Sequence, residues 1–149
     1  MWSRVLSIAA GLLLLAVGCS SSDDSAATEA PSPEYSQLFD DYIAAWNATD
    51  GAAVRSMVTD SYTWEWGDLS LPSSDIEGYV NNWAGTNFVA EIVGEPIWAG
   101  SSGEAFVSMA MHMTSDWGIH GPIDMDAIVT LTIDGDDLLV ARHVHFATP

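Results

Sequence analysis

Residues 33–66 read PEYSQLFDDYIAAWNATDGAAVRSMVTDSYTWEW, and this stretch carries most of the information about the fold. Its first part has large apolar residues at the i, i+3, i+4, i+7 spacing that forms one face of an α-helix. Those residues are Tyr35, Leu38, Phe39, Tyr42, Ile43 and Trp46. The spacing predicts an amphipathic helix, and the Asn-Ala-Thr-Asp-Gly run at residues 47–51 predicts the corner that ends it.

A second short helix and a strand are predicted to complete the stretch. Asp50 is a suitable N-cap for a helix from Ala52 to about Val58. The aromatic and β-branched residues 62–66 then predict a strand. Because side chains alternate along a strand, we expect Glu65 to face opposite to Trp64 and Trp66.

A third helix and four strands are predicted downstream. Ser74 and Glu77 fit a capping box at the start of a helix that runs to about Ala84. Turns rich in Gly, Ser and Asp then separate four segments with strand patterning, at residues 88–98, 104–114, 124–133 and 138–147. The Gly-Glu-Pro run at residues 94–96 predicts a bulge or break in the first of these strands. Helices followed by a strand meander predict an α+β fold, in which a mainly antiparallel sheet curls over the first helix and leaves a pocket.

The opening stretch also resembles a known family. The resemblance rests on the run from Tyr42 to Asp50, on Val54, Met57 and Asp60, and on the run from Tyr62 to Glu65. These residues look like the opening of NTF2-like domains, and more narrowly of the branch that contains SnoaL-like polyketide cyclases and ketosteroid isomerases. The resemblance covers residues 34–149 and implies a cone of three N-terminal helices packed on a curved, mainly antiparallel sheet. It also allows a homodimer through the outer face of the sheet.

Residues 1–18 have the features of an export signal. Arg4 precedes fourteen apolar or small residues, Val5 to Gly18, which are too few to span a bilayer but suit a signal peptide. Small residues directly before Cys19, the single cysteine, resemble the lipoprotein box of bacteria, with an ordinary secretory signal as the alternative. The lipoprotein interpretation makes Cys19 the lipidated mature N-terminus. It places the protein in the cell envelope, anchored to the outer face of the cytoplasmic membrane.

The remaining composition limits the partners of the protein. Residues 19–33 are an acidic tether rich in Ser, Ala and Pro, which cannot bury enough surface to fold. The whole chain has 21 acidic residues and three cationic ones, giving a net charge of −18. Such a chain repels phosphate backbones, so no nucleic-acid binding is predicted. It also offers no basic patch for anionic lipids, so we expect membrane attachment to depend on the lipid at Cys19.

One candidate for chemistry comes from the resemblance. Ketosteroid isomerases move a proton beside a carbonyl with a carboxylate on the first strand, and the resemblance places that base at Glu65. One extra residue in the preceding turn would place Trp66 there instead, and both registers stay open. If Glu65 were buried among tryptophans, the pKa of its carboxyl would be raised. The isomerase's oxyanion-binding aspartic acid falls on Val129, so ketosteroid isomerisation itself is not expected.

Three histidines are the other candidates for acid–base chemistry. His143 and His145 share one face of the last strand with Ala141, while Val140 takes the opposite face and His112 lies on a neighbouring strand. The three can line a pocket, exchange protons or bind a metal. No third ligand is fixed and no His-Glu motif is present, so no metal is predicted. The sequence also has no nucleophile, phosphate-binding or dinucleotide motif, so no cofactor is predicted.

Several aromatic residues are candidates for contacting a ligand. They are Tyr42, Trp46, Trp64, Trp66 and Trp83, of which Tyr42 also belongs to the apolar stripe of the first helix. We therefore expect a domain that binds a small apolar molecule in its cone. Two alternatives stay open. One is an isomerase, cyclase or hydratase that uses Glu65 together with the histidines, and the other is a protein-interaction or dimerisation module whose cone is filled by side chains.

Overall fold

The computed structural model describes residues 31–101, 103–117 and 121–147. The predicted signal peptide, Cys19 and most of the tether lie outside the described residues. In chain order the elements are α1 (Pro33–Asn47), α2 (Gly51–Ser56), β1 (Val58–Trp66), β2 (Leu69–Pro72), α3 (Ser73–Asn81), β3 (Val89–Ser101), β4 (Glu104–Ser115), β5 (Ile123–Asp134) and β6 (Leu139–Ala147). None of the helices in these ranges has the length and hydropathy needed to cross a membrane.

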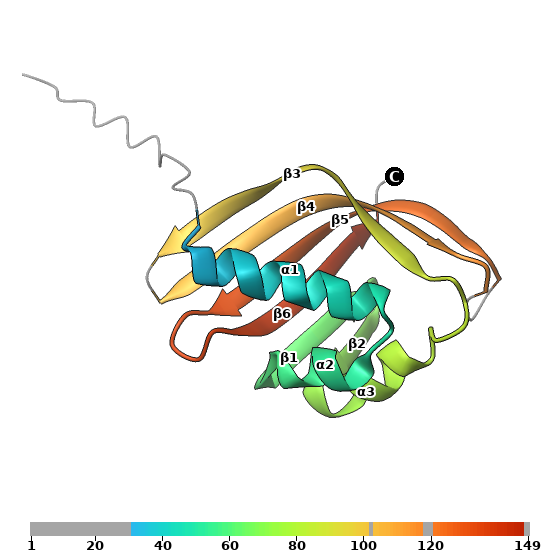
Figure 1. Cartoon of the computed structure of the whole chain (residues 1–149), viewed down its shortest axis with the longest axis horizontal. Coiled ribbons are helices and arrows are strands. Elements are labelled where there is room, and N and C mark those ends of the chain that lie inside the picture. The colour runs from blue at the N-terminus through green and yellow to red at the C-terminus, as the bar shows by residue number, and fades with distance from the viewer. Residues whose placement is uncertain (1–30, 102, 118–120, 148–149) are drawn as a thin grey trace, which may run out of the picture.

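The strands form one sheet in the order β2-β1-β6-β5-β4-β3. Only β1 and β6 run parallel, and every other neighbouring pair in this sheet is antiparallel. Figure 1 shows the long strands curving around α1, with α2 and α3 beside β1 and β2. The predicted α+β architecture, a curved and mainly antiparallel sheet with helices on one face, is therefore confirmed.

Helix α1 is positioned by its predicted aromatic stripe. Phe39, Tyr42 and Trp46 are buried against the sheet, and the Phe39 ring meets the Trp98 ring of β3 edge-on at 5.5 Å between centroids. At the end of the helix, the Asn47 side chain accepts a hydrogen bond from Ala90 N at 2.7 Å and donates one to Ala90 O at 3.1 Å. The two bonds satisfy the backbone N–H and C=O groups of Ala90 on β3, which is an edge strand of the sheet. They also hold the end of α1 against β3.

The elements around β1 differ from the prediction in three places. Val58 begins β1 rather than ending the second helix. The sequence predicted no strand between residues 66 and 74, yet β2 pairs with β1 there, with Trp64 opposite Leu71. The strand has only four residues and ends in a proline, so its sequence has little intrinsic preference for strand structure. It forms because it pairs with β1. The expected capping box is also absent, because the Ser74 hydroxyl donates to Asp75 Oδ1 instead.

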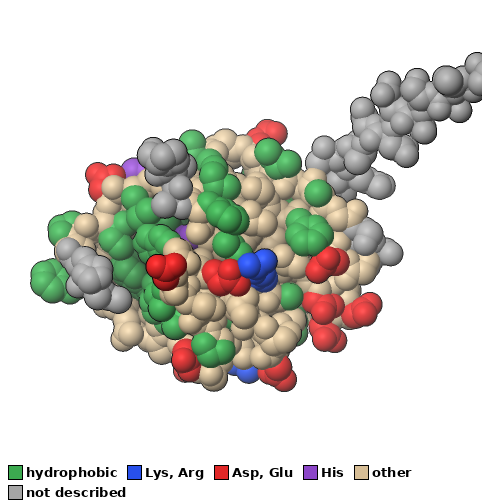
Figure 2. Space-filling view, turned by 180° about the vertical axis from the view of Figure 1, so that it is seen from behind, with side chains coloured by type: hydrophobic (Ala, Val, Ile, Leu, Met, Phe, Trp, Pro, Cys, Tyr) green, Lys and Arg blue, Asp and Glu red, His purple; other side chains and the backbone are tan. Residues whose placement is uncertain are grey.

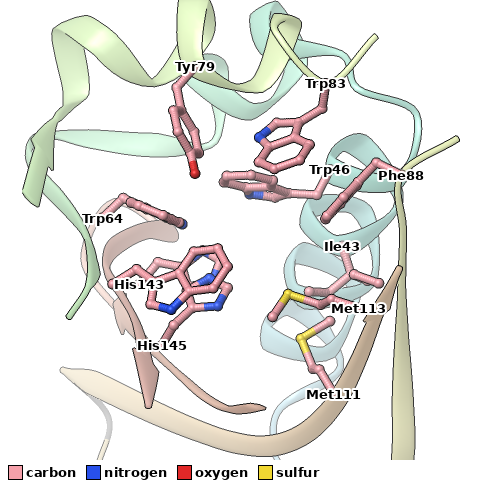
Figure 3. Close-up of a pocket in the computed structure, with 12 residues that line it drawn as sticks. Ile43, Trp46, Trp64, Tyr79, Trp83, Phe88, Met111, Met113, His143 and His145 are labelled. Atoms are coloured by element: carbon pink, nitrogen blue, oxygen red, sulfur yellow. The ribbon is translucent and has the colours of Figure 1, made fainter. Parts of the chain in front are cut away.

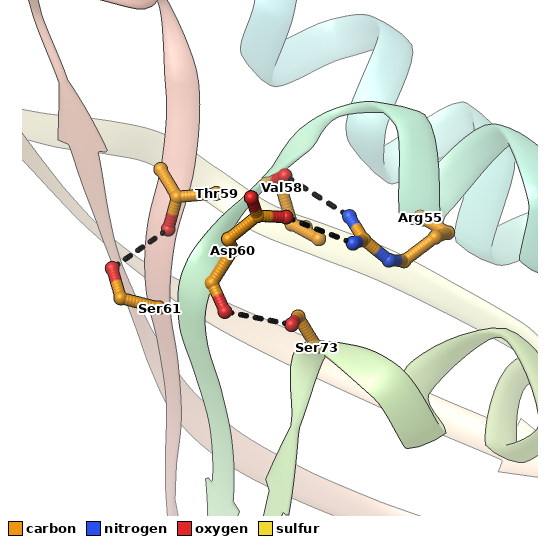
Figure 4. A network of polar contacts seen from close by, with 6 residues as sticks. All are labelled: Arg55, Val58, Thr59, Asp60, Ser61 and Ser73. Carbon is orange, nitrogen blue, oxygen red and sulfur yellow. Dashed lines mark hydrogen bonds and ion pairs between the residues drawn. The ribbon is translucent and has the colours of Figure 1, made fainter.

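A small polar network fixes the geometry where these elements meet (Figure 4). Arg55 on α2 forms an ion pair with Asp60 on β1, at 3.0 Å between Nη2 and Oδ1. The Ser73 hydroxyl at the start of α3 donates to the Asp60 carbonyl at 2.8 Å. The network therefore ties both short helices to β1, the strand that carries Trp64 and Trp66.

A register shift in β6 decides which side chains enter the cone. Thr132 pairs with Arg142 while Ile133 pairs with Val140, so Ala141 is an extra residue in β6. A bulge of this kind reverses the alternation of side chains. Val140 is consequently buried on the same side as His143, and the prediction that it faces the opposite way was wrong.

The outer face of the sheet is partly apolar. Val93, Ala110, Ile128 and Phe146 lie opposite one another on β3, β4, β5 and β6, and three of the four are exposed large hydrophobic residues. Figure 2 shows the side of the molecule opposite to Figure 1, where hydrophobic side chains gather in a band with acidic side chains around it. This is the face on which the family resemblance allows a homodimer, and that homodimer stays a prediction.

Replacing Gly51 by Ala should destabilise the fold by about 2 kcal/mol, because a Cβ there would lie 2.2 Å from the Glu77 carbonyl oxygen of the neighbouring α3. Gly78→Ala is the matched control: Gly78 lies within α3, and a Cβ there has no atom within 4 Å. That change should stabilise the protein by about 0.5 to 1 kcal/mol. Urea unfolding followed by tryptophan fluorescence measures both changes. Equal effects of the two substitutions would contradict close packing of α2 on α3.

Candidate functional site

A pocket opens inside the cone between α1, α3 and the concave face of the sheet (Figure 3). Its empty volume is about 410 Å³, including the open mouth. It is lined by Ile43, Trp46, Trp64, Trp66, Tyr79, Trp83, Phe88, Ala90, Met111, Met113, His143 and His145. No carboxylate, lysine or arginine is among these residues.

One side of the pocket, here called the polar wall, consists of Trp64, His143 and His145. The parallel pairing of β1 with β6 places Trp64 beside His143 and Trp66 beside His145. The two imidazole rings are stacked, with centroids 4.5 Å apart and 17° between their planes. Trp66 stacks in turn on His145, at 5.4 Å. The histidines are therefore held among aromatic faces rather than by charged partners.

The orientation of His143 is set by two tyrosines behind it. Its Nδ1 atom forms a 2.8 Å hydrogen bond with the Tyr42 hydroxyl of α1. That hydroxyl is also 2.8 Å from the Tyr62 hydroxyl of β1. Nδ1 is thus occupied by Tyr42, whereas Nε2 is buried and has no hydrogen-bond partner among the described residues. Burial raises the pKa of both tyrosines, so their hydroxyls stay protonated.

Both wall histidines are neutral at neutral pH. Burial lowers the pKa of His145 to about 4. Burial, together with the neighbouring His145, holds the pKa of His143 well below its ordinary value. The Tyr79 hydroxyl points into the pocket from α3 (Figure 3), and burial raises its pKa to about 12. The lining of the pocket is therefore uncharged, although the chain as a whole is strongly acidic.

The opposite side, here called the apolar wall, consists of Ile43, Phe88, Met111 and Met113 (Figure 3). None of these residues was predicted from the sequence to contact a ligand. Strand alternation places Met111 and Met113 on one face of β4 with Val107, and all three are buried. This alternation is the sequence pattern from which Met111 and Met113 could have been predicted to face inward. The sequence does not show, however, that β4 and α1 face each other across a pocket.

The predicted aromatic contacts divide into two groups. Trp46, Trp64, Trp66 and Trp83 all line the pocket. Tyr42 is fully buried behind the polar wall and reaches the pocket through its bond to His143.

Glu65 lies on the outer face of the sheet, away from the pocket. Its two carboxylate oxygens accept hydrogen bonds from Arg142, at 2.9 Å from Nε and 2.7 Å from Nη2. This bidentate pair, rather than a tryptophan environment, lowers the pKa of the carboxyl. The condition for a raised pKa, burial among tryptophans, is therefore not met, because alternation turns Glu65 outward while Trp64 and Trp66 turn inward. Of the two registers, Trp66 is the one whose side chain lines the pocket.

His112 is also separated from the other two histidines. It lies on the outer face, with Nδ1 at 2.8 Å from Asp126 and Nε2 at 3.6 Å from Asp124. These carboxylates, Asp126 first, raise its pKa. The concave face thus brings His143 and His145 together but not His112. In the part of the chain that the structure describes, no three His, Cys, Asp or Glu side chains are grouped so as to hold a metal ion.

The fold of the described residues is the NTF2-like fold, as the sequence predicted. An NTF2-like protein from Cytophaga hutchinsonii has a similar structure, with a TM-score of 0.55 and 10% identity over 77% of this chain and 90% of that one. A proposed calcium/calmodulin dependent protein kinase II association domain from Xanthomonas campestris is also similar, with a TM-score of 0.66 and 16% identity over 81% and 90%. BvnE pinacolase from Penicillium brevicompactum gives a TM-score of 0.61 and 14% identity over 76% and 85%. The chain matches no protein-family model and no curated protein sequence.

The free energy of unfolding should fall when the pH is lowered from 6.5 to about 5. An unfolded histidine binds a proton with an ordinary pKa of 6.5, whereas His143 and His145 have lowered pKa values and stay neutral in the fold. The unfolded state therefore binds more protons, and stability rises with pH by up to about 1.4 kcal/mol per pH unit for each of the two. Urea unfolding across this pH range measures the slope.

The control variants for this slope separate buried from exposed histidines. The double variant His143→Gln, His145→Gln should lose most of the pH dependence. His112→Gln should leave it nearly unchanged, because the pKa of His112 is raised and both states bind that proton below pH 6.5. A slope that persists in the double variant would contradict neutral, buried histidines in the fold.

Proposed function

We propose that this protein binds a small, flat, apolar molecule in its cone. The observation that carries the proposal is an open pocket walled by six aromatic rings and containing no charged side chain. Aromatic rings contribute large apolar contact areas and stack favourably on flat ligands.

The proposal includes the location of the protein. The export signal and the lipoprotein-like segment before Cys19 support a lipid-anchored domain on the outer face of the cytoplasmic membrane. Residues 19–33 would act as the tether, since their composition favours an extended, solvated chain. A ligand reaching the pocket would then come from the cell envelope or the surroundings of the cell.

Catalysis in the same pocket is a second candidate function. It is favoured by the bond from Tyr42 to His143, which orients a buried imidazole of the pocket lining and leaves its Nε2 atom without a hydrogen-bond partner among the described residues. An oriented imidazole can exchange protons with a bound molecule. One similar fold, BvnE, is a pinacolase, so the fold accommodates enzymes. The isomerase, cyclase or hydratase of the sequence-based alternative would then rely on His143 and His145, because Glu65 and His112 lie on the outer face.

Ligand binding should quench or shift the tryptophan fluorescence of the full chain carrying Cys19→Ser, titrated with steroids, polyketide-like aromatics and fatty acids. Trp66→Ala should weaken binding of the responsive class about tenfold, which corresponds to about 1.4 kcal/mol of lost stacking. Trp117→Ala is the control, because Trp117 is 70% exposed and does not line the pocket. No saturable response from any class, or equal affinity in Trp66→Ala, would contradict the proposal. Conversion of a bound compound that disappears in His143→Gln would favour the enzyme.

Cys19→Ser should release the protein from the membrane fraction, because no other feature of the sequence supplies an anchor. Membrane fractionation of cells that express the chain, with immunodetection, measures the distribution. Ser20→Ala is the matched control and should stay with the membranes. Retention of the Cys19→Ser protein in the membrane fraction would overturn the lipoprotein assignment.

A further inference from the structure

The accessible surface of the pocket is apolar, although histidines and tryptophans line it. Trp64 Nε1, His143 Nε2 and both ring nitrogens of His145 are buried beneath that surface and do not face the open space. A molecule in the pocket therefore meets ring faces and aliphatic or thioether groups rather than hydrogen-bond donors and acceptors. The ligand must be one that needs no hydrogen bond for its recognition.

Aromatic rings surround this space on several sides. Four of the seven tryptophans of the chain line it. The rings do not form a single stack, because the planes of Trp64 and Tyr79 meet at 46°, those of Tyr79 and Trp83 at 79°, and those of Trp83 and Phe88 at 41°. Figure 3 shows these four side chains around one opening. The rings are here called the aromatic cage, which consists of Trp46, Trp64, Trp66, Tyr79, Trp83 and Phe88.

The faces of aromatic rings attract cations, because the π-system carries a negative face, and tryptophan is the strongest partner. The attraction grows when the cation is removed from water. No cation of the protein occupies the cage. Both arginines of the described residues form ion pairs elsewhere, Arg55 with Asp60 and Arg142 with Glu65. The ring faces are therefore available to a cation that enters from outside.

The charge of the chain and the chemistry of the pocket together select one kind of cation. The net charge of −18 attracts cations and repels anions. No acidic side chain is among the described residues that line the pocket, so the N–H groups of a primary ammonium would be buried there without acceptors. A quaternary nitrogen has no N–H group, and its charge is spread over the carbons bonded to it. It therefore enters an apolar pocket without losing a hydrogen bond to water.

Building on the proposed function, we propose that the flat, largely apolar ligand is an organic cation whose charge lies on a quaternary nitrogen. An N-alkylated aromatic ring and a trimethylammonium group on a flat skeleton are the two forms of this chemistry. The aromatic cage holds the charged end of the ligand by its ring faces. Ile43, Met111 and Met113 contact the uncharged remainder.

Calorimetric titration with two compounds of one shape tests this assignment. The probes are N-methylquinolinium and 1-methylnaphthalene, which are both flat and bicyclic and differ only in a charged nitrogen in place of a carbon. The protein is the full chain carrying Cys19→Ser. The buffer contains about 1 M NaCl, where the Debye length is about 3 Å, so the net charge of the chain hardly contributes. We expect the cation to bind about tenfold more tightly, which corresponds to about 1.4 kcal/mol.

Three leucine substitutions show whether the preference comes from the aromatic cage. Trp66→Leu and Phe88→Leu each remove a ring but keep an apolar side chain, so each should lower the ratio of the two affinities at least threefold. Met111→Leu is the matched control, because it replaces a lining residue without a ring by one of similar volume and should keep the ratio. A change in stability alone does not alter a ratio measured within one variant. Phe88 is only partly buried, so Phe88→Leu tests the cage if Trp66→Leu does not fold.

The contrary outcomes are distinct. If 1-methylnaphthalene binds as tightly as N-methylquinolinium or more tightly, the inference is overturned and the proposed function stands. A preference for the cation that is unchanged in both Trp66→Leu and Phe88→Leu, or one that is present at low salt and vanishes at about 1 M NaCl, would also overturn the inference, because the net charge and not the cage would then cause it. If neither compound binds, the proposed function fails for flat bicyclic ligands, and the inference fails with it.

Discussion

The burial of the aromatic face of α1 is the constraint on which the rest of the structure depends. Phe39, Tyr42 and Trp46 are too large to be covered by a flat sheet, so the long strands β3 to β6 curve around them. The same curvature leaves the space that becomes the pocket, because α3 and Phe88 close only part of the opening. The helix thus determines both the core and the cavity beside it.

The parallel pairing of β1 with β6 brings together the polar side chains that line this cavity. It brings Trp64 next to His143, residues that are far apart in the sequence, and Tyr42 on α1 then bonds to the imidazole from behind. Strand alternation separates the charged groups from this site, since the Glu65–Arg142 pair and the His112–Asp126 pair both lie on the outer face. An uncharged interior with unsatisfied polar atoms is the result.

Such an interior is unfavourable for stability and is therefore informative about function. Replacing His143 and His145 by apolar residues of similar size would remove the cost of burying unpaired nitrogens and the loss of stability in acid. Natural proteins keep features of this kind mainly at functional sites, where local rules of stability are broken for a ligand. The polar wall is the clearest such violation within the described residues.

The sequence alone determined the α+β class, the positions of most elements and the placing of Trp64 and Trp66 on the strand face opposite to Glu65, because these depend on local periodicity and strand alternation. It did not reveal β2, which exists only through its pairing with β1, or the bulge at Ala141, which turns Val140 inward with His143. It also ranked Glu65 and His112 with His143 and His145, since residue type and spacing do not show which face of a sheet becomes concave. Only the tertiary structure decided that, because the concave face is set by contacts between α1 and strands that follow it at a distance along the chain.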